Sequence, residues 1–245
     1  LRIGGGWKYF NQLKVIQKNN NSYVEVIMSP SKLLSSSKTH SKSCLLRAEM
    51  NLENILKQRL PFSKLDMSKP HIMGIVNINS DSFYKNSQKM DYGSVKNTFE
   101  KMQRFGASII DLGGESTRPG SKKISPSEEQ DRVIQIIQSL KEHNYKSLIS
   151  LDTRNFSTMK KGYRKGVDII NDITGFNDKK KIDFVSKNKT PIVVMHMQRD
   201  PENMQKNPKY NFAPIDIYKF FQKKITELIN MGVDSANIVI DLSLI

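Results

Sequence analysis

The chain has 245 residues, of which 37% are hydrophobic and 26% charged, a composition that fits one sizeable globular domain or a domain with an appendage. Its formal net charge of +15 favours small anionic partners such as diphosphates, and we attribute the excess to a lysine-rich surface rather than to nucleic-acid binding. The single cysteine excludes an internal disulfide. No apolar run reaches the roughly 18 residues of a membrane-spanning helix, so we expect a cytoplasmic protein that binds neither nucleic acid nor a membrane.

Residues 1–69 carry no motif that identifies an activity. Serine and lysine dominate residues 29–43, which predicts a linker or an irregular surface segment. Apolar residues near helical spacing predict a helix over residues 48–60 that Pro61 ends. The sequence begins with leucine and lacks the layout of a signal peptide. We therefore expect residues 1–69 to be an N-terminal extension of unknown role, either a linker or the remnant of a fused domain.

Residues 70–245 alternate between short apolar runs and segments of helical periodicity. Strands are expected at residues 72–78, 108–112, 147–151, 167–170, 191–195 and 237–240. Helices are expected over residues 91–105, from a capping box at residues 125–128, around 156–163, around 182–185 and from residue 214. This alternation predicts right-handed βαβ units around a parallel sheet. No G-x-G-x-x-G follows the first strand, so an incomplete TIM-type barrel is favoured over a Rossmann fold.

Every expected strand delivers a polar side chain at its carboxyl end: Asn77, Asp111, Asp152, Asn171, His196 and Asp241. The carboxyl ends of parallel strands meet on one side of a sheet, so these residues predict one polar floor at the position of an active site. Carboxylates and amides suit a flat heterocycle with N–H, amino and carbonyl edges. No nucleophile with an assignable base is evident, which favours positioning and leaving-group stabilisation over covalent catalysis, with no residue assigned as an acid or base.

Three local predictions accompany this reading of the floor. His196 is expected to be a hydrogen-bonded floor residue rather than a general base. Residues 179–181 (KKK) are expected to be the solvated start of a helix. Residues 109–120 (IIDLGGESTRPG) are expected to be a buried strand that breaks into a polar loop, where glycines allow a close approach to a ligand and Arg118 can grip an anion.

These motifs together resemble those of dihydropteroate synthase. The matching segments, in chain order, are IMGIVN at residues 72–77 with DSF at 81–83, DLGGESTRPG at 111–120, SLDT at 150–153, INDI at 170–173 and MHM at 195–197. The resemblance covers about residues 70–241. The GGESTRPG segment argues against a methyltetrahydrofolate-binding domain, the nearest alternative among pterin-binding modules.

The resemblance implies a folate-pathway transferase on a TIM barrel, a target of sulfonamides, that uses Mg²⁺. It would join para-aminobenzoate to 6-hydroxymethyl-7,8-dihydropterin diphosphate and release diphosphate. Asn77 would contact the metal or the diphosphate, and Thr117 and Arg118 would hold the diphosphate or shape the aminobenzoate pocket. The remaining residues implied to bind the pterin are Asp152, Asn171 and Asp241, with Met195 lining its pocket. Those implied to form the first loop over the second substrate are Asp81, Ser82 and Phe83.

One departure from the family pattern concerns the end of the sequence. The family continues after the aspartate of the sixth strand with Pro-Gly-x-Gly-Phe, whereas LSLI follows Asp241 here and the sequence stops. We therefore expect a barrel of about six βα units, with weak or absent turnover, and a homodimer only for the full-length fold. The alternatives are an inactive pterin-binding fragment and the C-terminal part of a bifunctional diphosphokinase–dihydropteroate synthase.

Overall fold

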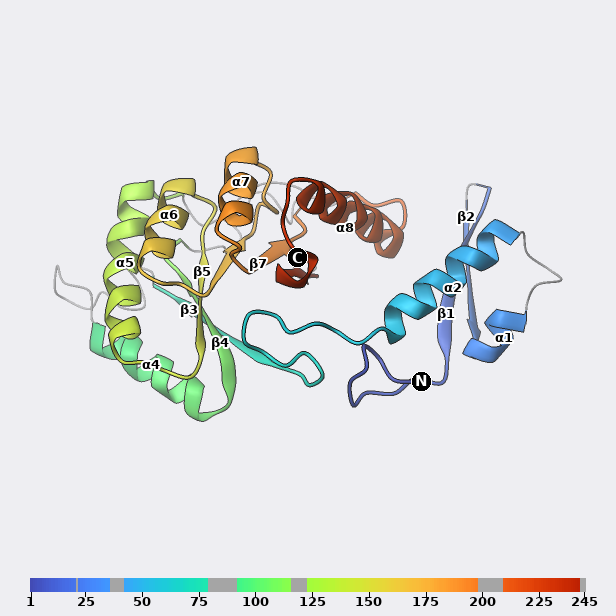
Figure 1. The fold of residues 1–245 in the computed structure, drawn as a ribbon. Helices are drawn as coiled ribbons and strands as arrows, with labels where there is room; N and C mark the ends of the chain where they lie inside the picture. Colours follow the sequence, from blue (N-terminus) through green and yellow to red (C-terminus); the bar gives the residue numbers. More distant parts are fainter. Residues whose placement is uncertain (21, 36–41, 79–91, 116–122, 198–208, 243–245) are drawn as a thin grey trace. The chain divides into compact units, whose positions relative to one another are not determined.

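The computed structural model describes residues 1–20, 22–35, 42–78, 92–115, 123–197 and 209–242 (Figure 1). These residues form two compact units. The first contains Leu1–Pro61 and Asp66–Pro70, and the second contains Phe62–Leu65 and His71–Ile245. Within the described ranges, no helix is both long enough and apolar enough to cross a membrane.

The first unit contains a hairpin that the sequence analysis did not predict. Strands β1 (Leu13–Asn19) and β2 (Ser22–Met28) pair antiparallel, with Val15 opposite Val26 and Ile16 opposite Glu25. Helices α1 (Pro30–Ser35) and α2 (Lys42–Leu56) follow. The predicted linker over residues 29–43 is therefore wrong at both of its ends, because serine and lysine there occupy helical turns.

Helix α2 ends at Leu56, four residues before the predicted end, because its last carbonyl groups have partners outside the helix. The backbone N–H of Gly4 donates to the Ile55 carbonyl at 2.7 Å. The Arg59 guanidinium donates to the Asn54 carbonyl at 3.0 Å. These bonds satisfy carbonyls that a continuing helix would otherwise use, so Pro61 is not what ends the helix.

The second unit is a six-stranded parallel sheet in the chain order β3-β4-β5-β6-β7-β8. The strands are β3 (Ile72–Asn77), β4 (Ala107–Gly113), β5 (Leu148–Asp152), β6 (Ile169–Asp172), β7 (Ile192–Met195) and β8 (Ile238–Asp241). The connecting helices are α4 (Tyr92–Arg104), α5 (Pro126–Glu142), α6 (Phe156–Arg164), α7 (Lys179–Lys187) and α8 (Ala213–Asn230). The predicted α/β class and incomplete TIM-type barrel are confirmed, since the sheet curls and, among described residues, β3 pairs only with β4 and β8 only with β7.

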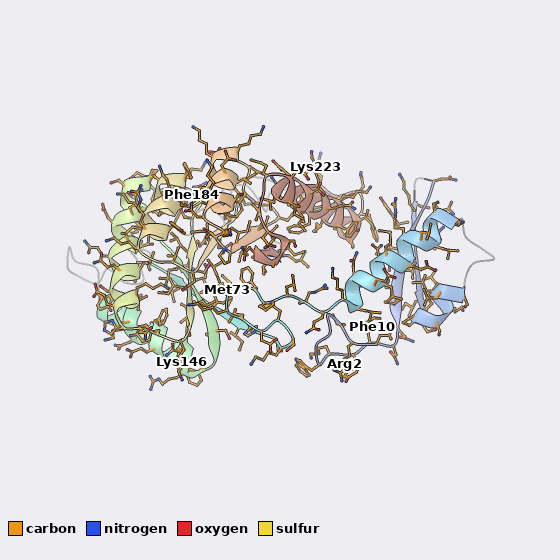
Figure 2. All side chains as sticks on the ribbon, viewed as in Figure 1. Arg2, Phe10, Met73, Lys146, Phe184 and Lys223 are labelled. Carbon is orange, nitrogen blue, oxygen red and sulfur yellow. The ribbon has the colours of Figure 1, made fainter. Side chains whose placement is uncertain are left out.

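The two faces of this sheet differ in what covers them. One face, called the outer face below, presents apolar side chains such as Ile110, Leu151 and Ile170 to the helices, where they join one buried core. Alternate residues along each strand point to the opposite, inner face. Figure 2 labels Phe184, an α7 residue of the helical layer, which lies edge-on to Phe156 at 5.8 Å between ring centroids.

Local sequence signals account for several boundaries of this unit. Ser125 caps α5 by accepting a hydrogen bond from the Glu128 N–H at 3.1 Å, as the capping box predicts. Strand β6 begins at Ile169, two residues after the predicted start. The reason is that the Val167 N–H donates to the Gly162 carbonyl and so closes the end of α6.

Candidate functional site

Four residues at the carboxyl ends of adjacent strands form one row on the inner face of the sheet. The strand register pairs Asn77 with Gly113, Gly113 with Asp152, and Asp152 with Asn171. Residues at the same level of neighbouring parallel strands point to the same face. The structure therefore brings three predicted site side chains together, those of Asn77, Asp152 and Asn171.

Gly113 leaves a gap in this row between two polar side chains. A Cβ atom at position 113 would lie 3.4 Å from Asn77 Oδ1 and 3.4 Å from Asp152 Oδ2. Any larger side chain would fill the space between the amide and the carboxylate. The absence of a side chain at this position keeps the space open, as a flat ligand lying against the row requires.

Asp111 lies one layer below the row, inside β4 rather than at its end. The Asn171 side-chain amide donates to Asp111 Oδ2 at 3.0 Å, whereas Asp111 Oδ1 and Asn171 Oδ1 are buried and have no hydrogen-bond partner among described residues. Burial raises the pKa of Asp111, although the nearby Ser150 hydroxyl and the Asn171 amide favour its charged form, and the charge of Asp241 raises it further. Two buried acceptors on the inner face therefore have no donor among the described residues.

Asp152 stands in a strongly acidic environment. It keeps some exposed surface, but protein groups surround its carboxyl group. Burial raises the pKa of Asp152 well above its ordinary value, and the charges of Asp111, Asp172 and two glutamates add to this effect. No cation of the described chain offsets this charge at Asp152 itself, so the carboxyl group suits a donor supplied by a ligand.

The last two strands bring the remaining described site residues to the same face. Met195 pairs with Asp241 in the register of β7 and β8, and Val193, two residues before Met195, pairs with Val239. Because Val193 is level with Asn171, Met195 and Asp241 stand on the inner face one layer above the row. Met195 is buried, and its role in lining a pterin pocket stays a prediction.

His196 is the exception among the predicted floor residues, and its placement on the floor is wrong. It follows Met195 and therefore points the other way, toward α8, where its ring lies edge-on to Phe220 at 4.6 Å between centroids. Tyr210 and Phe221 complete this aromatic surrounding. Burial lowers the pKa of His196, in keeping with this aromatic surrounding.

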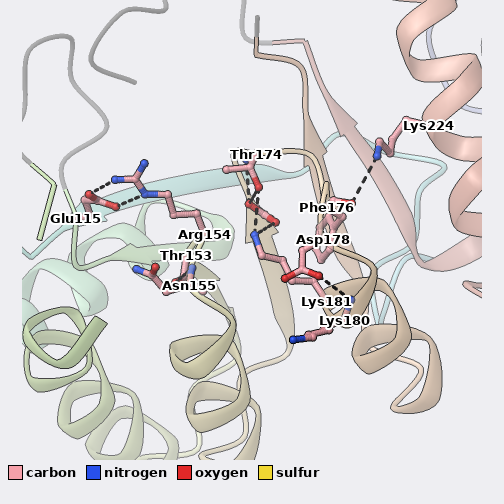
Figure 3. Close-up of polar contacts among 11 residues, drawn as sticks. Glu115, Thr153, Arg154, Asn155, Thr174, Phe176, Asp178, Lys180, Lys181 and Lys224 are labelled. Carbon is pink, nitrogen blue, oxygen red and sulfur yellow. Dashed lines mark hydrogen bonds and ion pairs between the residues drawn. The ribbon is translucent and has the colours of Figure 1, made fainter. Parts of the chain in front are cut away.

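Lys181 was predicted to be solvated, and the structure contradicts this. Its ammonium group donates to Asp172 Oδ2 at 2.8 Å and to the Thr174 hydroxyl at 3.2 Å (Figure 3). The Lys181 side chain is 8% exposed and that of Asp172 is 0% exposed. Lys181 lies four residues before the buried Val185, so helical spacing places it on the apolar face of α7, a signal that the run of three lysines obscures.

A second ion pair lies beyond the ends of β4 and β5, and the sequence analysis missed it. The Arg154 guanidinium donates through Nε to Glu115 Oε2 at 2.8 Å and through Nη2 to Glu115 Oε1 (Figure 3). Both side chains are nearly buried, at 10% exposed for Glu115 and 13% for Arg154. No sequence signal links the two residues, because they meet only through the pairing of two strands.

Five predicted site residues lie outside the described part of the chain: Asp81, Ser82, Phe83, Thr117 and Arg118. Their predicted roles at the diphosphate and aminobenzoate therefore stay predictions.

Among the described residues, Asn77 is a candidate ligand for a metal ion. No group of three or more histidine, cysteine, aspartate or glutamate side chains in the described ranges could hold one. Asn77 presents a side-chain amide oxygen beside the gap at Gly113. Mg²⁺ prefers oxygen ligands and is often held by one or two protein groups together with substrate phosphates, so Asn77 fits as one ligand of an ion carried by a diphosphate.

Comparison with known proteins identifies the family of this chain. A family model described as "Pterin binding enzyme" matches residues 73–245. The chain belongs to the pterin-binding enzyme family. Among curated relatives, it is 35% identical over 178 residues to the dihydropteroate synthase of Haemophilus influenzae, an alignment that covers 73% of this chain and 64% of that protein. The dihydropteroate synthase of Neisseria meningitidis serogroup C is 36% identical over 184 residues, with 73% and 63% coverage.

Solved structures of the family match the fold as well. A Yersinia pestis dihydropteroate synthase in complex with a sulfonamide drug has a TM-score of 0.67 and 32% identity, covering 75% of this chain and 67% of that one. A Xanthomonas albilineans dihydropteroate synthase in complex with 7,8-dihydropteroate has a TM-score of 0.63 and 26% identity, with 74% and 63% coverage. The chain spans just under two thirds of the length of the curated relatives it matches.

Proposed function

We propose that this chain carries the pterin-binding site of a dihydropteroate synthase. That enzyme condenses 6-hydroxymethyl-7,8-dihydropterin diphosphate with para-aminobenzoate to give 7,8-dihydropteroate and diphosphate. The observation that carries the proposal is the row Asn77–Gly113–Asp152–Asn171 on the inner face, with unpaired buried acceptors beneath it. A pterin presents ring N–H and amino donors along one edge, which such acceptors would bind.

Asp152, Asn171 and Asp241 are proposed to hold the pterin edge, and Met195 to pack against the ring. Burial and neighbouring carboxylates raise the pKa of Asp152, so a ligand that supplies donors there relieves an unfavourable interaction. Binding energy would therefore come from groups that have no partner among the described residues. Such groups lower the stability of the fold and favour a ligand that supplies the missing donors.

The reaction needs positioning rather than a protein nucleophile. The bond between the pterin methylene carbon and the diphosphate oxygen breaks, diphosphate leaves with the electron pair, and the aromatic amine attacks the methylene carbon and loses a proton. Asn77 would hold a Mg²⁺ ion, which, when bound, offsets the negative charge on the leaving diphosphate. Thr117 and Arg118 are proposed to hold the diphosphate or shape the aminobenzoate pocket, and Asp81, Ser82 and Phe83 to cover the second substrate.

A second candidate is a pterin-binding chain without turnover. It is supported by the row of Asn77, Asp152 and Asn171, which accounts for pterin binding, whereas Thr117 and Arg118, proposed for the diphosphate, lie outside the described residues. The two candidates agree on the pterin site and differ only in chemistry. The expected cytoplasmic location and the homodimer of the full-length fold stay predictions.

Diphosphate release in the presence of both substrates and Mg²⁺ distinguishes the candidates. The synthase proposal predicts release that depends on para-aminobenzoate and is lost in Asp152→Asn. The Lys141→Met variant is the matched control, because it breaks a partly buried pair with Asp168 at the amino end of the sheet, away from the row. If the folded chain binds the pterin but releases no diphosphate, the second candidate holds; if it binds no pterin, both fail.

A further inference from the structure

The Glu115–Arg154 pair continues the alignment of β4 and β5 beyond the end of their ladder. The last paired residues of the two strands are Gly113 and Asp152. Glu115 stands two residues after Gly113, and Arg154 stands two residues after Asp152, so the ion pair occupies the next position on the same face. Two parallel bonds between a guanidinium and a carboxylate fix both distance and orientation.

Other contacts fix the Glu115 side of this pair. The backbone N–H of Ile124 donates to Glu115 Oε1 at 3.4 Å. The Arg132 guanidinium, on α5, donates to the Gly114 carbonyl at 2.8 Å and is itself nearly buried. A Cβ at position 114 would lie 2.9 Å from Val133 Cγ1, so Gly114 packs directly on α5. The segment from Gly113 to Glu115 is therefore held from the helix on one side and from Arg154 on the other.

We propose that Glu115 and Arg154 are a positioning pair that locks the carboxyl ends of β4 and β5, and thereby fixes Asp152 relative to the gap at Gly113. The pair touches no proposed ligand position and would act through Asp152. The inference therefore rests on the proposed pterin site. A pair that serves only stability could lie anywhere on the sheet. This one joins the two strand ends that carry the central members of the row, where a shift of one strand changes the shape of the site.

Two backbone hydrogen bonds tie the ends of β4 and β5 to their other neighbours, β3 and β6, and so report on the order of these strand ends without any ligand. The Ile78 N–H donates to the Gly113 carbonyl at 2.7 Å, and the Thr153 N–H donates to the Asn171 carbonyl at 3.0 Å. The Ile170 N–H, bonded to the Pro191 carbonyl at 3.0 Å farther from the pair, serves as a reference amide. If the pair holds the strand ends, exchange at Ile78 and Thr153 depends on it more than exchange at Ile170 does.

The test combines hydrogen exchange with calorimetric titration of 6-hydroxymethyl-7,8-dihydropterin diphosphate into the full chain. In Arg154→Met, exchange at Ile78 and Thr153 relative to Ile170 should rise, and pterin affinity should fall by about tenfold or more. Arg154→Lys keeps the charge but cannot make two parallel hydrogen bonds to Glu115. Its changes in exchange and in pterin affinity should therefore be smaller than those of Arg154→Met. Glu115→Gln should resemble Arg154→Met. In the control Lys141→Met, thermal stability should fall while relative exchange and affinity stay as in the wild type.

The outcomes separate this inference from the proposed function. Unchanged relative exchange in Arg154→Met, or faster exchange with unchanged pterin affinity, overturns the positioning role. If the wild-type chain binds no pterin diphosphate, the proposed function fails. The exchange ratio alone then shows whether the pair aligns the strand ends. In that case an increase confirms that the pair aligns the strand ends, and no increase rejects it.

Discussion

Carboxylates on the inner floor and carboxylates just outside it have opposite surroundings. Asp172 and Glu115 each meet a cation, Lys181 and Arg154 respectively, with their oxygens fully engaged. Asp111 and Asp152 lie on the inner face without a cation from the described residues, and burial raises the pKa of each. The carboxylates with a cation partner support the strand ends. Those without one among the described residues lower stability and can accept hydrogen bonds from a ligand. The contrast separates residues that support the structure of the site from residues proposed to bind the ligand.

Breaking the buried Lys181–Asp172 pair should have the largest effect on stability. Lys181→Met leaves Asp172 buried without its cation, which should lower the free energy of unfolding by about 3–5 kcal/mol. Chemical denaturation measures this loss. The double variant Lys181→Met with Asp172→Asn should recover part of it, because Thr174 can still donate to the asparagine oxygen. A loss below about 1 kcal/mol in the single variant would show that the pair does not support the fold.

Asp152→Asn should weaken ligand binding without lowering stability, since it removes a carboxylate that no cation of the described residues pairs with. Pterin affinity should fall by about 10- to 100-fold, the equivalent of about 1.5–3 kcal/mol for a hydrogen bond to a charged group. The thermal midpoint of the ligand-free chain should stay the same or rise. Calorimetry and a thermal melt on one preparation check both. A fall in the midpoint comparable with that of Lys181→Met would place Asp152 among the supporting carboxylates.

Filling the gap at Gly113 tests the floor without changing charge. In Gly113→Ala, the new methyl group would lie 3.4 Å from Asn77 Oδ1 and Asp152 Oδ2, contacts that the fold tolerates. A ligand that uses the gap would lose about tenfold in affinity, near the low end of the cost of overpacking. Calorimetry measures the affinity and circular dichroism the fold. Gly106→Ala is not a suitable control, because Gly106 has a φ of +92°.

Substitution of Glu129 should have the smallest effect, a change in how stability depends on pH. It is fully buried on α5, where burial raises its pKa above the ordinary value of 4.5 even though Asn155 donates to it. The folded chain keeps this proton to higher pH than the unfolded chain does, so its contribution to stability is complete below pH 4.5 and is lost as pH rises through the folded pKa. Glu129→Gln should remove that part of the slope and change stability by less than about 1 kcal/mol.

Denaturation midpoints at several pH values test the Glu129 prediction. Asp111 and Asp152 contribute slopes of the same sign, so the stability of Glu129→Gln should still fall with pH, though less steeply than that of the wild type. A steeper fall in the variant would mean that Glu129 is stabilised in its charged form, contrary to its surroundings.

The sequence predicted the barrel unit well because its signals are local. Continuous apolar runs, the Ser125 cap and the glycines after helices each depend on a few neighbouring residues. The hairpin of the first unit lacks such signals. Apolar residues of its strands stand at exposed positions, with Ile27 64% and Val24 44% exposed. Apolar and polar residues therefore do not alternate clearly along the sequence.

For the site, the sequence predicted which residues lie at strand ends but not which side chains meet. Asn77, Asp152 and Asn171 share a row because of the register, and the same parity turns His196 away to the helices. The pairs Glu115–Arg154 and Asp172–Lys181 depend on contacts between different elements, which no local pattern encodes. Ion pairs of this kind require the fold before they can be recognised.

The central claim is that the row of Asn77, Gly113, Asp152 and Asn171 on the inner face binds a pterin. Calorimetric titration of the folded chain with 6-hydroxymethyl-7,8-dihydropterin diphosphate and Mg²⁺ tests it directly. The account predicts saturable binding of one ligand per chain, weakened by Asp152→Asn and unaffected by Lys141→Met. No heat of binding from a chain that circular dichroism shows to be folded would contradict it.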